Sequence, residues 1–209
     1  MVPGAGSPSR HPRWHRLALV AALACGSLLA VSTPTLAQRQ LPEAEIRAAF
    51  ILKFPAFLTW SHPLGDTLRI GVVDGEELLA ALDRLAAQHN AQPEGGPLPG
   101  VPRVVRVEAV SSSGDPTPFD ILVLAGAATG GAPDLIERAH RAGVLTIDSR
   151  SESGGDTVII LNRESTKICF DINLAAARAA AIKISSRLLQ LAHGHQGIIL
   201  VREDRARLC

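Results

Sequence analysis

The run from Phe119 to Leu124, apolar except for Asp120, constrains the fold more than any other segment of this chain. A strand without polar alternation needs cover on both faces, as in a parallel sheet packed between helices. Two helical segments, Glu76–Ala87 and Asp134–Arg141, lie among the strands. Further strand-like segments are Leu68–Val73, Arg103–Val110 and Val144–Ile147. The order β-α-β-β-α-β predicts a single compact α/β domain with a mostly parallel sheet flanked by helices, a Rossmann-like sandwich.

The last third of the chain has a different pattern. Thr157–Leu161 and Lys167–Ile172 are short β-rich runs with five polar residues between them, which predicts an antiparallel hairpin. Leu174–Ala192 lacks Gly and Pro and is rich in helix formers, so we expect one long closing helix with Asn173 as its N-cap. The apolar residues 198–201 are compatible either with an edge strand or with a disordered extension.

The segment Pro42–Trp60 is predicted to open the domain as a helix. Its acidic first turn favours a helix start, and Pro55 predicts a kink near residues 51–54. The large side chains share one face at helical spacing, which is typical of core, but such a stripe could also anchor a partner. Trp60, at the end of the stripe, is the member that we expect to be partly exposed. The stripe consists of Ile46, Phe50, Phe54 and Phe57.

The first 37 residues are predicted to be a secretory signal peptide. Three arginines precede the apolar run Leu17–Val31, and Thr35-Leu36-Ala37 supplies small residues before a cleavage point. A lipoprotein signal that uses Cys25 and a retained membrane anchor are the alternative interpretations. With cleavage after Ala37, we expect a domain over residues 38–192 and a C-terminal tail over 193–209.

Composition narrows the functional classes. The 209 residues include 21 Lys and Arg against 20 Asp and Glu, a balance that argues against nucleic-acid binding. Beyond the signal peptide the cysteines are Cys169 and Cys209, too few for a disulfide framework. Cys169 is interpreted as a small core side chain. A bridge to Cys209, or a link between two chains through Cys209, stays open.

Several polar residues are candidates for chemistry. Asp74 and Asp148 follow predicted parallel strands, and ligands bind beyond the carboxyl ends of such strands, so the pair could hold a ligand or cation. The simpler interpretation is that each carboxylate begins a turn. The loop 126–131 could bind an anion at a helix start, and His193 with His195 could chelate a metal, but neither matches a complete motif. We predict neither a cofactor, nor a metal site, nor catalytic residues.

Several motifs together resemble the YfiR-like family of exported bacterial proteins. Ala48-Ala49-Phe50-Ile51-Leu52-Lys53-Phe54 is similar to its opening signature, and Val144–Asp148 to a strand of the family. The best match is Phe170-Asp171-Ile172-Asn173-Leu174-Ala175-Ala176-Ala177-Arg178, continued by Ile184-Ser185-Ser186-Arg187-Leu188-Leu189. The resemblance covers residues 44–192. Many relatives carry a cysteine where this chain has Phe119-Asp120, and Pro55 is unusual in the opening helix.

The resemblance implies a periplasmic, non-enzymatic regulator that represses an inner-membrane diguanylate cyclase through its periplasmic sensor region. Relief of that contact would raise cyclic-di-GMP and favour biofilm. Candidate partner-binding residues are Trp60, Asp171, Asn173 and Arg178, and a homodimer is possible. The alternatives are a periplasmic small-molecule-binding module that feeds a sensor kinase or transporter, with a pocket near Asp74 and Gly126, and, with least support, a hydrolase.

Overall fold

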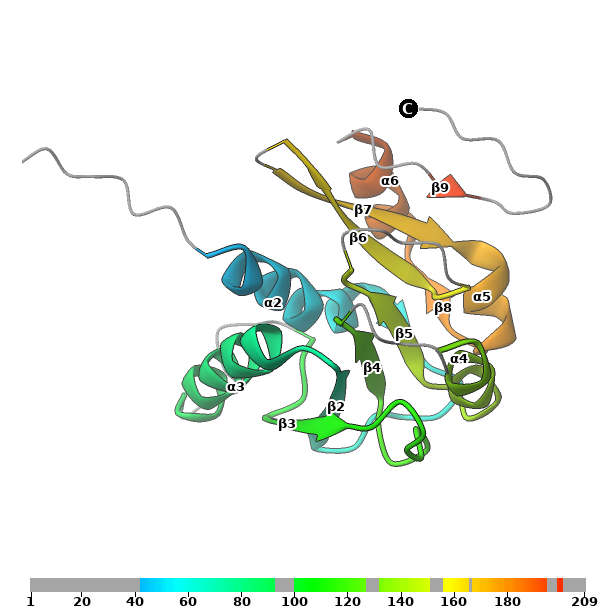
Figure 1. The fold of residues 1–209 in the computed structure, drawn as a ribbon. Helices are drawn as coiled ribbons and strands as arrows, with labels where there is room; N and C mark the ends of the chain where they lie inside the picture. The colour runs from blue at the N-terminus through cyan, green and yellow to red at the C-terminus, as the bar shows by residue number, and fades with distance from the viewer. Residues whose placement is uncertain are drawn as a thin grey trace, which may run out of the picture. The chain divides into compact units, whose positions relative to one another are not determined.

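The computed structural model describes residues 42–92, 100–126, 132–150, 156–165, 167–194 and 199–200. All of them belong to one unit of the chain, Leu41–Cys209. Within these residues a seven-stranded sheet has the order β3-β2-β4-β5-β6-β7-β9 (Figure 1). None of the described helices has the length and apolar character needed to cross a membrane.

The first half of the sheet is parallel, as the sequence predicts. Strand β2 pairs with β3 on one side and β4 on the other, and β4, β5 and β6 continue in the same direction. The elements are β2 (Thr67–Val73), α3 (Glu76–Asn90), β3 (Val104–Val110), β4 (Ile121–Leu124), α4 (Ala132–Arg141) and β5 (Leu145–Asp148).

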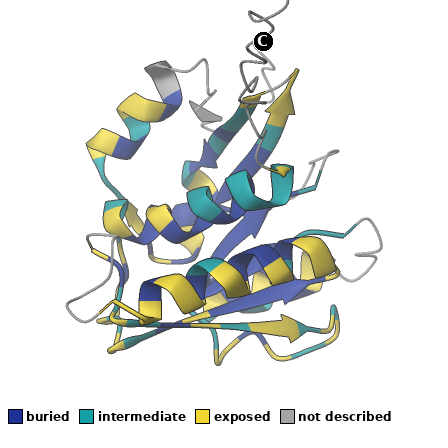
Figure 2. Ribbon diagram, turned by 90° about the vertical axis from the view of Figure 1, so that its left-hand side faces the viewer, coloured by how far each residue is buried: buried dark blue, intermediate teal, exposed yellow. Residues whose placement is uncertain are grey.

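The position of β4 between two core clusters explains why its sequence is apolar throughout. Ile121 and Val123 belong to the core cluster that includes α3 and the first helix, α2 (Glu43–Lys53). Leu122 and Leu124 belong to a second cluster, with α4 on the opposite face. All four side chains are completely buried, and Figure 2 shows the buried strands beneath helices whose outer faces are exposed. The sheet is therefore covered on both faces.

The predicted hairpin is also present. Strand β6 (Ile159–Glu164) pairs antiparallel with β7 (Lys167–Asn173), and Ser165 in the turn has a φ of 53°. Strand β9 (Ile199–Leu200) adds to β7 in parallel. Of the two interpretations of residues 198–201, the edge strand is therefore confirmed for residues 199 and 200.

The opening helix stops where a kink was predicted. Helix α2 ends at Lys53, and Phe54–Phe57 form the 3₁₀ helix η1, with Pro55 in its first turn. Proline has no backbone N–H and crowds the carbonyl four residues earlier, so the α-helical ladder does not continue past it. The chain then enters the two-residue strand β1 (Leu58–Thr59).

The prediction of one long closing helix is wrong. Residues 174–194 form α5 (Leu174–Ala179), strand β8 (Lys183–Ile184) and α6 (Ser186–Gly194). The helix ends at Ala179 in a Schellman motif. The Ile182 N–H donates to the Ala177 carbonyl at 2.9 Å, and the Ala181 N–H donates to the Arg178 carbonyl at 3.0 Å. Ala181 has a φ of 52°, in the left-handed region where glycine is usual. An alanine at this position gives no sequence signal of a helix end.

The short strands that follow the ends of η1 and α5 lie side by side. Strands β1 and β8 pair antiparallel, with Leu58 opposite Ile184, and the Ser185 N–H donates to the Phe57 carbonyl at 2.9 Å. The Ser185 hydroxyl then accepts the Leu188 N–H and caps α6. We call η1, β1, β8 and α6 (residues 54–59 and 183–194) the clasp, because it joins the start of the folded unit to a segment near its end.

Candidate functional site

A cavity of about 850 Å³ opens at the carboxyl ends of β2, β4 and β5. Each of these strands contributes the residues that follow it, and the first turns of α2 and α3 complete the wall. In an α/β sheet this is the edge at which ligands are usually bound. The lining residues are Glu43, Ala44, Arg47, Gly75, Glu76, Glu77, Leu78, Ala125, Ser149 and Arg150.

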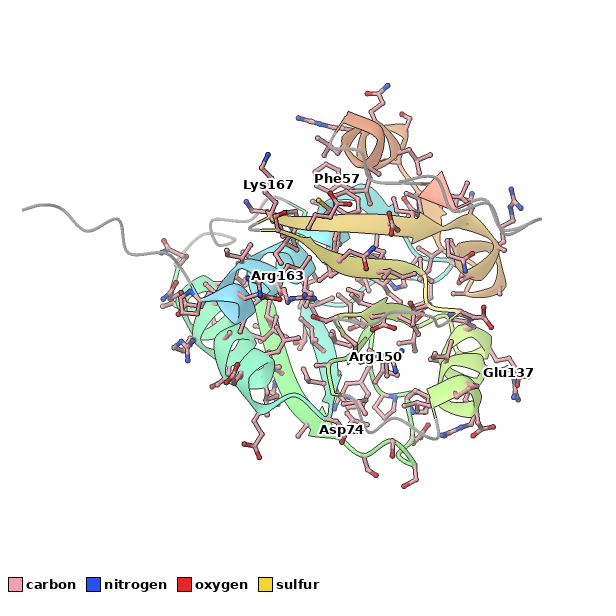
Figure 3. The ribbon with its side chains drawn as sticks, turned by 45° about the horizontal axis from the view of Figure 1, so that its top comes forward. Phe57, Asp74, Glu137, Arg150, Arg163 and Lys167 are labelled. Carbon is pink, nitrogen blue, oxygen red and sulfur yellow. The ribbon has the colours of Figure 1, made fainter. Side chains whose placement is uncertain are left out.

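Arg47 is the most buried charged residue of the cavity wall. Its side chain is 5% exposed, and Nη1 donates to the carbonyl of Ser149 at 2.8 Å and to that of Leu161 at 3.0 Å. Its Nε donates to Glu43 Oε1 at 2.8 Å, one helical turn earlier. Glu43 Oε2 lies 3.0 Å from Nη1 of Arg163, which Figure 3 shows beside the start of α2. This network connects α2 to the strands β5 and β6.

Asp148 is the last residue of β5 and is completely buried. Its Oδ1 accepts hydrogen bonds from the backbone N–H of Arg150 and from Arg150 Nε, at 3.0 and 2.8 Å. Hydrogen bonding to Asp148 raises the pKa of the Arg150 guanidinium, against the opposing effect of burial. The carboxylate therefore has a fixed cation, and Arg150 is the member of the pair that lines the cavity.

Asp74 lies at the same edge but in a different hollow. Its neighbours there come from the ends of β2 and β3, around a space of about 310 Å³ that includes Ala109 and Ser111. Asp74 has a φ of 53°, and a Cβ added to Gly126 would lie 2.1 Å from the Asp74 carbonyl oxygen. Asp74 and Asp148 are thus absent from the lining of the large cavity, and the ligand role predicted for them stays a prediction.

Two candidate motifs lie wholly or partly outside the described residues. Of the loop 126–131, the structure describes Gly126 alone, so the proposed anion site lies outside it. His195 is likewise outside, and His193 is described only as part of α6. Among the described residues, no group of three His, Cys, Asp or Glu side chains is placed to hold a metal ion.

The four candidate partner-binding residues have very different environments. Asn173 is 6% exposed, and its Oδ1 accepts the Ala176 N–H at 3.0 Å, which confirms the predicted N-cap. Asp171 is half-buried and accepts a hydrogen bond from the Asn162 amide on the neighbouring strand. Arg178 is exposed on α5, so it is the candidate that another protein could contact directly.

Trp60 is buried, which corrects the expectation that it is partly exposed. It is 8% exposed and belongs to the main core cluster. Phe54 is likewise buried, and its ring meets that of Phe170 edge-on, with 5.4 Å between centroids. Phe50 and Phe57 are half-buried against the same cluster. The aromatic stripe is therefore mainly core, and its role in partner binding stays untested.

Cys169 is a free, half-buried thiol on β7, less buried than the predicted core side chain. Its Sγ lies 3.6 Å from Glu164 Oε2. Burial raises the pKa of the thiol, and the negative charge of Glu164 adds to the effect. The second cysteine considered in the sequence, Cys209, lies outside the described residues.

Sequence reasoning missed Arg47, the residue that organises the cavity wall. A signal was present, because Arg47 precedes Ile51 by one helical turn and adjoins Ala48, and all three side chains are buried. The acidic Glu43 one turn earlier provides the ion-pair spacing. A basic residue inside an apolar stripe is usually exposed at the end of its flexible stem, so the pattern alone does not indicate burial.

Comparison with known proteins gives one result. A family model described as YfiR/HmsC-like matches residues 44–193, well over half of the chain. The match extends from the second residue of α2 to the penultimate residue of α6 and includes Arg47 with its carbonyl partners and nearly all of the clasp, whereas Glu43 lies just outside it. No curated protein matches the chain.

Proposed function

Because the chain belongs to the YfiR/HmsC-like family, we propose that it is a non-enzymatic regulator acting in the periplasm. Its target is an inner-membrane signalling protein, a diguanylate cyclase, which it represses by contact with the periplasmic sensor region. The observation that carries this proposal is the family match over residues 44–193.

The chemistry of the cavity supports binding rather than catalysis. The two arginines of its wall are each paired with a carboxylate, Arg47 with Glu43 and Arg150 with the buried Asp148, whereas Glu76 and Glu77 of the wall are exposed. A general acid or base must exchange a proton with its substrate at working pH. Carboxylates fixed by guanidinium groups are poorly suited to that exchange, whereas they make a rigid wall.

Export is part of the same proposal. Residues 1–37 act as a signal peptide and the folded domain follows them; the domain end predicted at residue 192 is too early, because α6 extends to Gly194 and residues 199–200 join the sheet as β9. Mass spectrometry of the protein from a periplasmic extract is expected to give a chain that begins at Gln38. A protein that retains Met1, or that carries lipid on Cys25, would contradict the assignment.

Repression requires the regulator to bind the inactive state of the cyclase more tightly than the active state. To shift a partner from 1% to 99% inactive, the affinity difference must be about 10⁴-fold, or about 5.5 kcal/mol. A rigid domain is well suited to this role because little conformational freedom is lost on contact. We place Arg178 in the contact, since it is the exposed member of the four candidate residues.

Deletion and complementation test the proposal. We expect loss of the gene to raise cyclic-di-GMP and surface attachment, and the native chain to reverse both. Arg178→Glu is expected to fold normally and to fail in this reversal. Arg103→Glu, which changes another exposed arginine, is the matched control and should complement fully. Unchanged cyclic-di-GMP after deletion would contradict the regulator, and full complementation by Arg178→Glu would contradict only the contact.

The cavity favours a second candidate function, a small-molecule-binding module that feeds a sensor kinase or transporter. Its volume of about 850 Å³ lies within the range of ligand pockets. A ligand at about a hundred times its dissociation constant adds about 2.7 kcal/mol of stability, which a thermal-shift screen of periplasmic metabolites would detect. Ala44→Leu, which fills part of the cavity, should abolish the shift. A screen without any stabilising compound would leave the contact regulator as the better account.

A further inference from the structure

Strand β3 forms one end of the sheet, and among the described residues it pairs with β2 alone, as Figure 1 shows. The Val104 N–H donates to the Asp66 carbonyl at 3.0 Å, so the backbone groups of the even-numbered residues of β3 point toward β2. Those of Val107 and Ala109 therefore point away from the sheet. The register with β2 is continuous, so no bulge turns this edge aside.

Asn90, at the end of α3, closes one position of this edge. Its Oδ1 accepts the Val105 N–H at 2.8 Å, and its Nδ2 donates to the Val105 carbonyl at 2.9 Å. The side-chain amide thus takes the place that a neighbouring strand would have at Val105. At the other end the strand stops at Val110. The free edge is therefore the segment 106–110.

Two hollows lie beside the free edge, one at each of its outward-bonding residues. The first, of about 390 Å³, adjoins Val107 and has the small side chains of Ala86 and Ala87 in its wall. The second, of about 310 Å³, adjoins Ala109 and has Leu79 of α3 in its wall. Alternate side chains of a strand share one face, so a strand added at this edge would direct alternate side chains to the two hollows. Extended peptides bind to sheet edges in this way, with backbone bonds for affinity and pockets for specificity.

We propose that the free edge binds an extended segment of a different protein, which adds to β3 as an antiparallel strand. The residues of the segment that lie opposite Val107 and Ala109 each exchange two backbone hydrogen bonds with β3. The proposal does not rest on the proposed function. Arg178, which we place in the cyclase contact, lies on α5 directly after β7, whereas β3 is at the other end of the sheet order.

The carboxylates of the second hollow select a basic side chain. Asp74 and Glu76 line this hollow and are exposed, and neither has an ion-pair partner among the described residues. The side chain opposite Ala109 points into the hollow, because directly opposed residues of an antiparallel pair lie on the same face. A lysine there would lay its apolar stem along Leu79 and bring its ammonium group to the two carboxylates.

The other face of the edge selects an acidic side chain. Arg106 is exposed and has no ion-pair partner among the described residues. Glu108 has one, since its Oε1 lies 3.7 Å from Arg69 Nη2. We therefore place an acidic residue opposite Arg106, a neutral residue opposite Glu108, and a β-branched apolar residue in the first hollow, opposite Val107. From its N-terminus the bound segment is basic, neutral, β-branched and acidic, as in Lys-Thr-Val-Glu.

A titration with a synthetic peptide tests the pairing. The probe is Ser-Lys-Thr-Val-Glu-Ser with blocked ends, and its binding is followed in amide NMR spectra of the purified, isotope-labelled protein. We expect saturable shift changes at residues 106–110 and along the walls of the two hollows. The reversed peptide, Ser-Glu-Val-Thr-Lys-Ser, has the same composition but opposes like charges, so it should bind about tenfold more weakly. No saturable change at these residues, or equal affinity for the two peptides, would overturn the proposal.

Charge reversal with rescue tests the register. Arg106→Glu should weaken binding of the probe about fivefold, and a probe with Lys in place of Glu should bind this variant at the original strength. Arg103→Glu changes an exposed arginine outside the free edge, so it is the matched control and should bind the original probe normally. Equal weakening by the two substitutions, or failure of the rescue, would refute the register.

Hydrogen exchange and a proline variant test whether the edge is free. In the protein alone, the amides of Val107 and Ala109 should exchange faster than those of Arg106 and Glu108, and the probe should slow them. Val107→Pro removes an N–H that points away from β2, so it should leave the sheet intact and abolish binding, whereas Val107→Thr keeps that N–H and should bind. Slow exchange of all four amides without the probe would mean that the chain itself covers the edge, and the proposal would then be wrong.

Discussion

The parallel sheet and the clasp are held together in different ways. In β4 and β5 all eight residues are buried, and the six apolar side chains belong to the two core clusters that lie on opposite faces of the sheet. In β1 and β8 the four residues are exposed or half-buried, and the pairing depends on two special backbone positions, Pro55 and Ala181. Packing therefore maintains the sheet, whereas the β1–β8 pairing depends on where α2 and α5 stop, although Phe54 and Leu188 anchor η1 and α6 of the clasp in the core.

The largest difference in stability between the sheet and the clasp is expected when one leucine of each is truncated to alanine. Leu122 in β4 is completely buried, and Leu122→Ala should lower the free energy of unfolding by about 3–4 kcal/mol through lost burial and a cavity. Leu189 in α6 is half-buried, so Leu189→Ala should cost only about 1 kcal/mol. Urea unfolding of both variants measures the contrast. Equal losses would mean that the clasp is as tightly packed as the sheet.

The Arg47 network joins the sheet to α2, and its removal should have the next largest effect. Arg47→Met leaves the carbonyls of Ser149 and Leu161 without their donor, at an expected cost of about 2–3 kcal/mol. Arg84 makes an exposed ion pair with Glu45, and Arg84→Met should change stability by less than about 1 kcal/mol. Similar values for the two variants in urea unfolding would contradict a structural role for the buried network.

Ala181 offers a test of the clasp alone. Ala181→Gly removes the strain of a Cβ at positive φ and should raise the free energy of unfolding by about 1 kcal/mol. Ala175 is an exposed residue inside α5, where the same change should lower stability by about 0.5–1 kcal/mol. Opposite signs in thermal unfolding are the expected result. Destabilisation by both substitutions would argue against the left-handed helix end.

A smaller, pH-dependent effect on the free energy of unfolding is expected from His140 in α4. His140 is buried, and its Nε2 lies 2.9 Å from the hydroxyl of Thr146 in β5. Burial lowers the pKa of the His140 imidazole, against an opposing effect of Asp156. The unfolded chain therefore binds this proton first, at a pH of about 6.5, so the free energy of unfolding should fall as the pH drops below that value.

The comparison for this effect is His140→Gln, which has no titrating ring. Urea unfolding at a series of pH values should show a weaker loss of stability in acid for the variant than for the native chain. Parallel profiles for the two proteins would mean that His140 does not contribute to the pH dependence.

The sequence predicts the sheet well because its signal is repeated. The run 119–124, apolar except for Asp120, and the strand-like segment 68–73 each indicate a buried strand, and the helices between strands follow from the crossover that parallel strands need. The clasp could not be predicted in this way. Its helix end depends on Ala181, and alanine is the strongest helix former, so the local preference and the structure disagree.

The sequence predicts the position of the candidate site but not the residues that organise its wall. The carboxyl ends of the strands were identified from Asp74 and Asp148, and the cavity lies at that edge. Its wall, however, is organised by Arg47, whose partners are carbonyl groups of residues 149 and 161. Backbone acceptors so distant along the chain give no signal in a single sequence, because every residue has a carbonyl group.

The clasp has a consequence for how this chain matures. The segment that pairs with β1 and bonds the Phe57 carbonyl is residues 183–185, which lie close to the end of the folded unit. A nascent chain cannot close its fold until that late segment has emerged, and contacts between distant segments form slowly. Such a delay fits the export that we propose for this chain, because a chain whose fold has not closed stays extended during passage through a translocation pore.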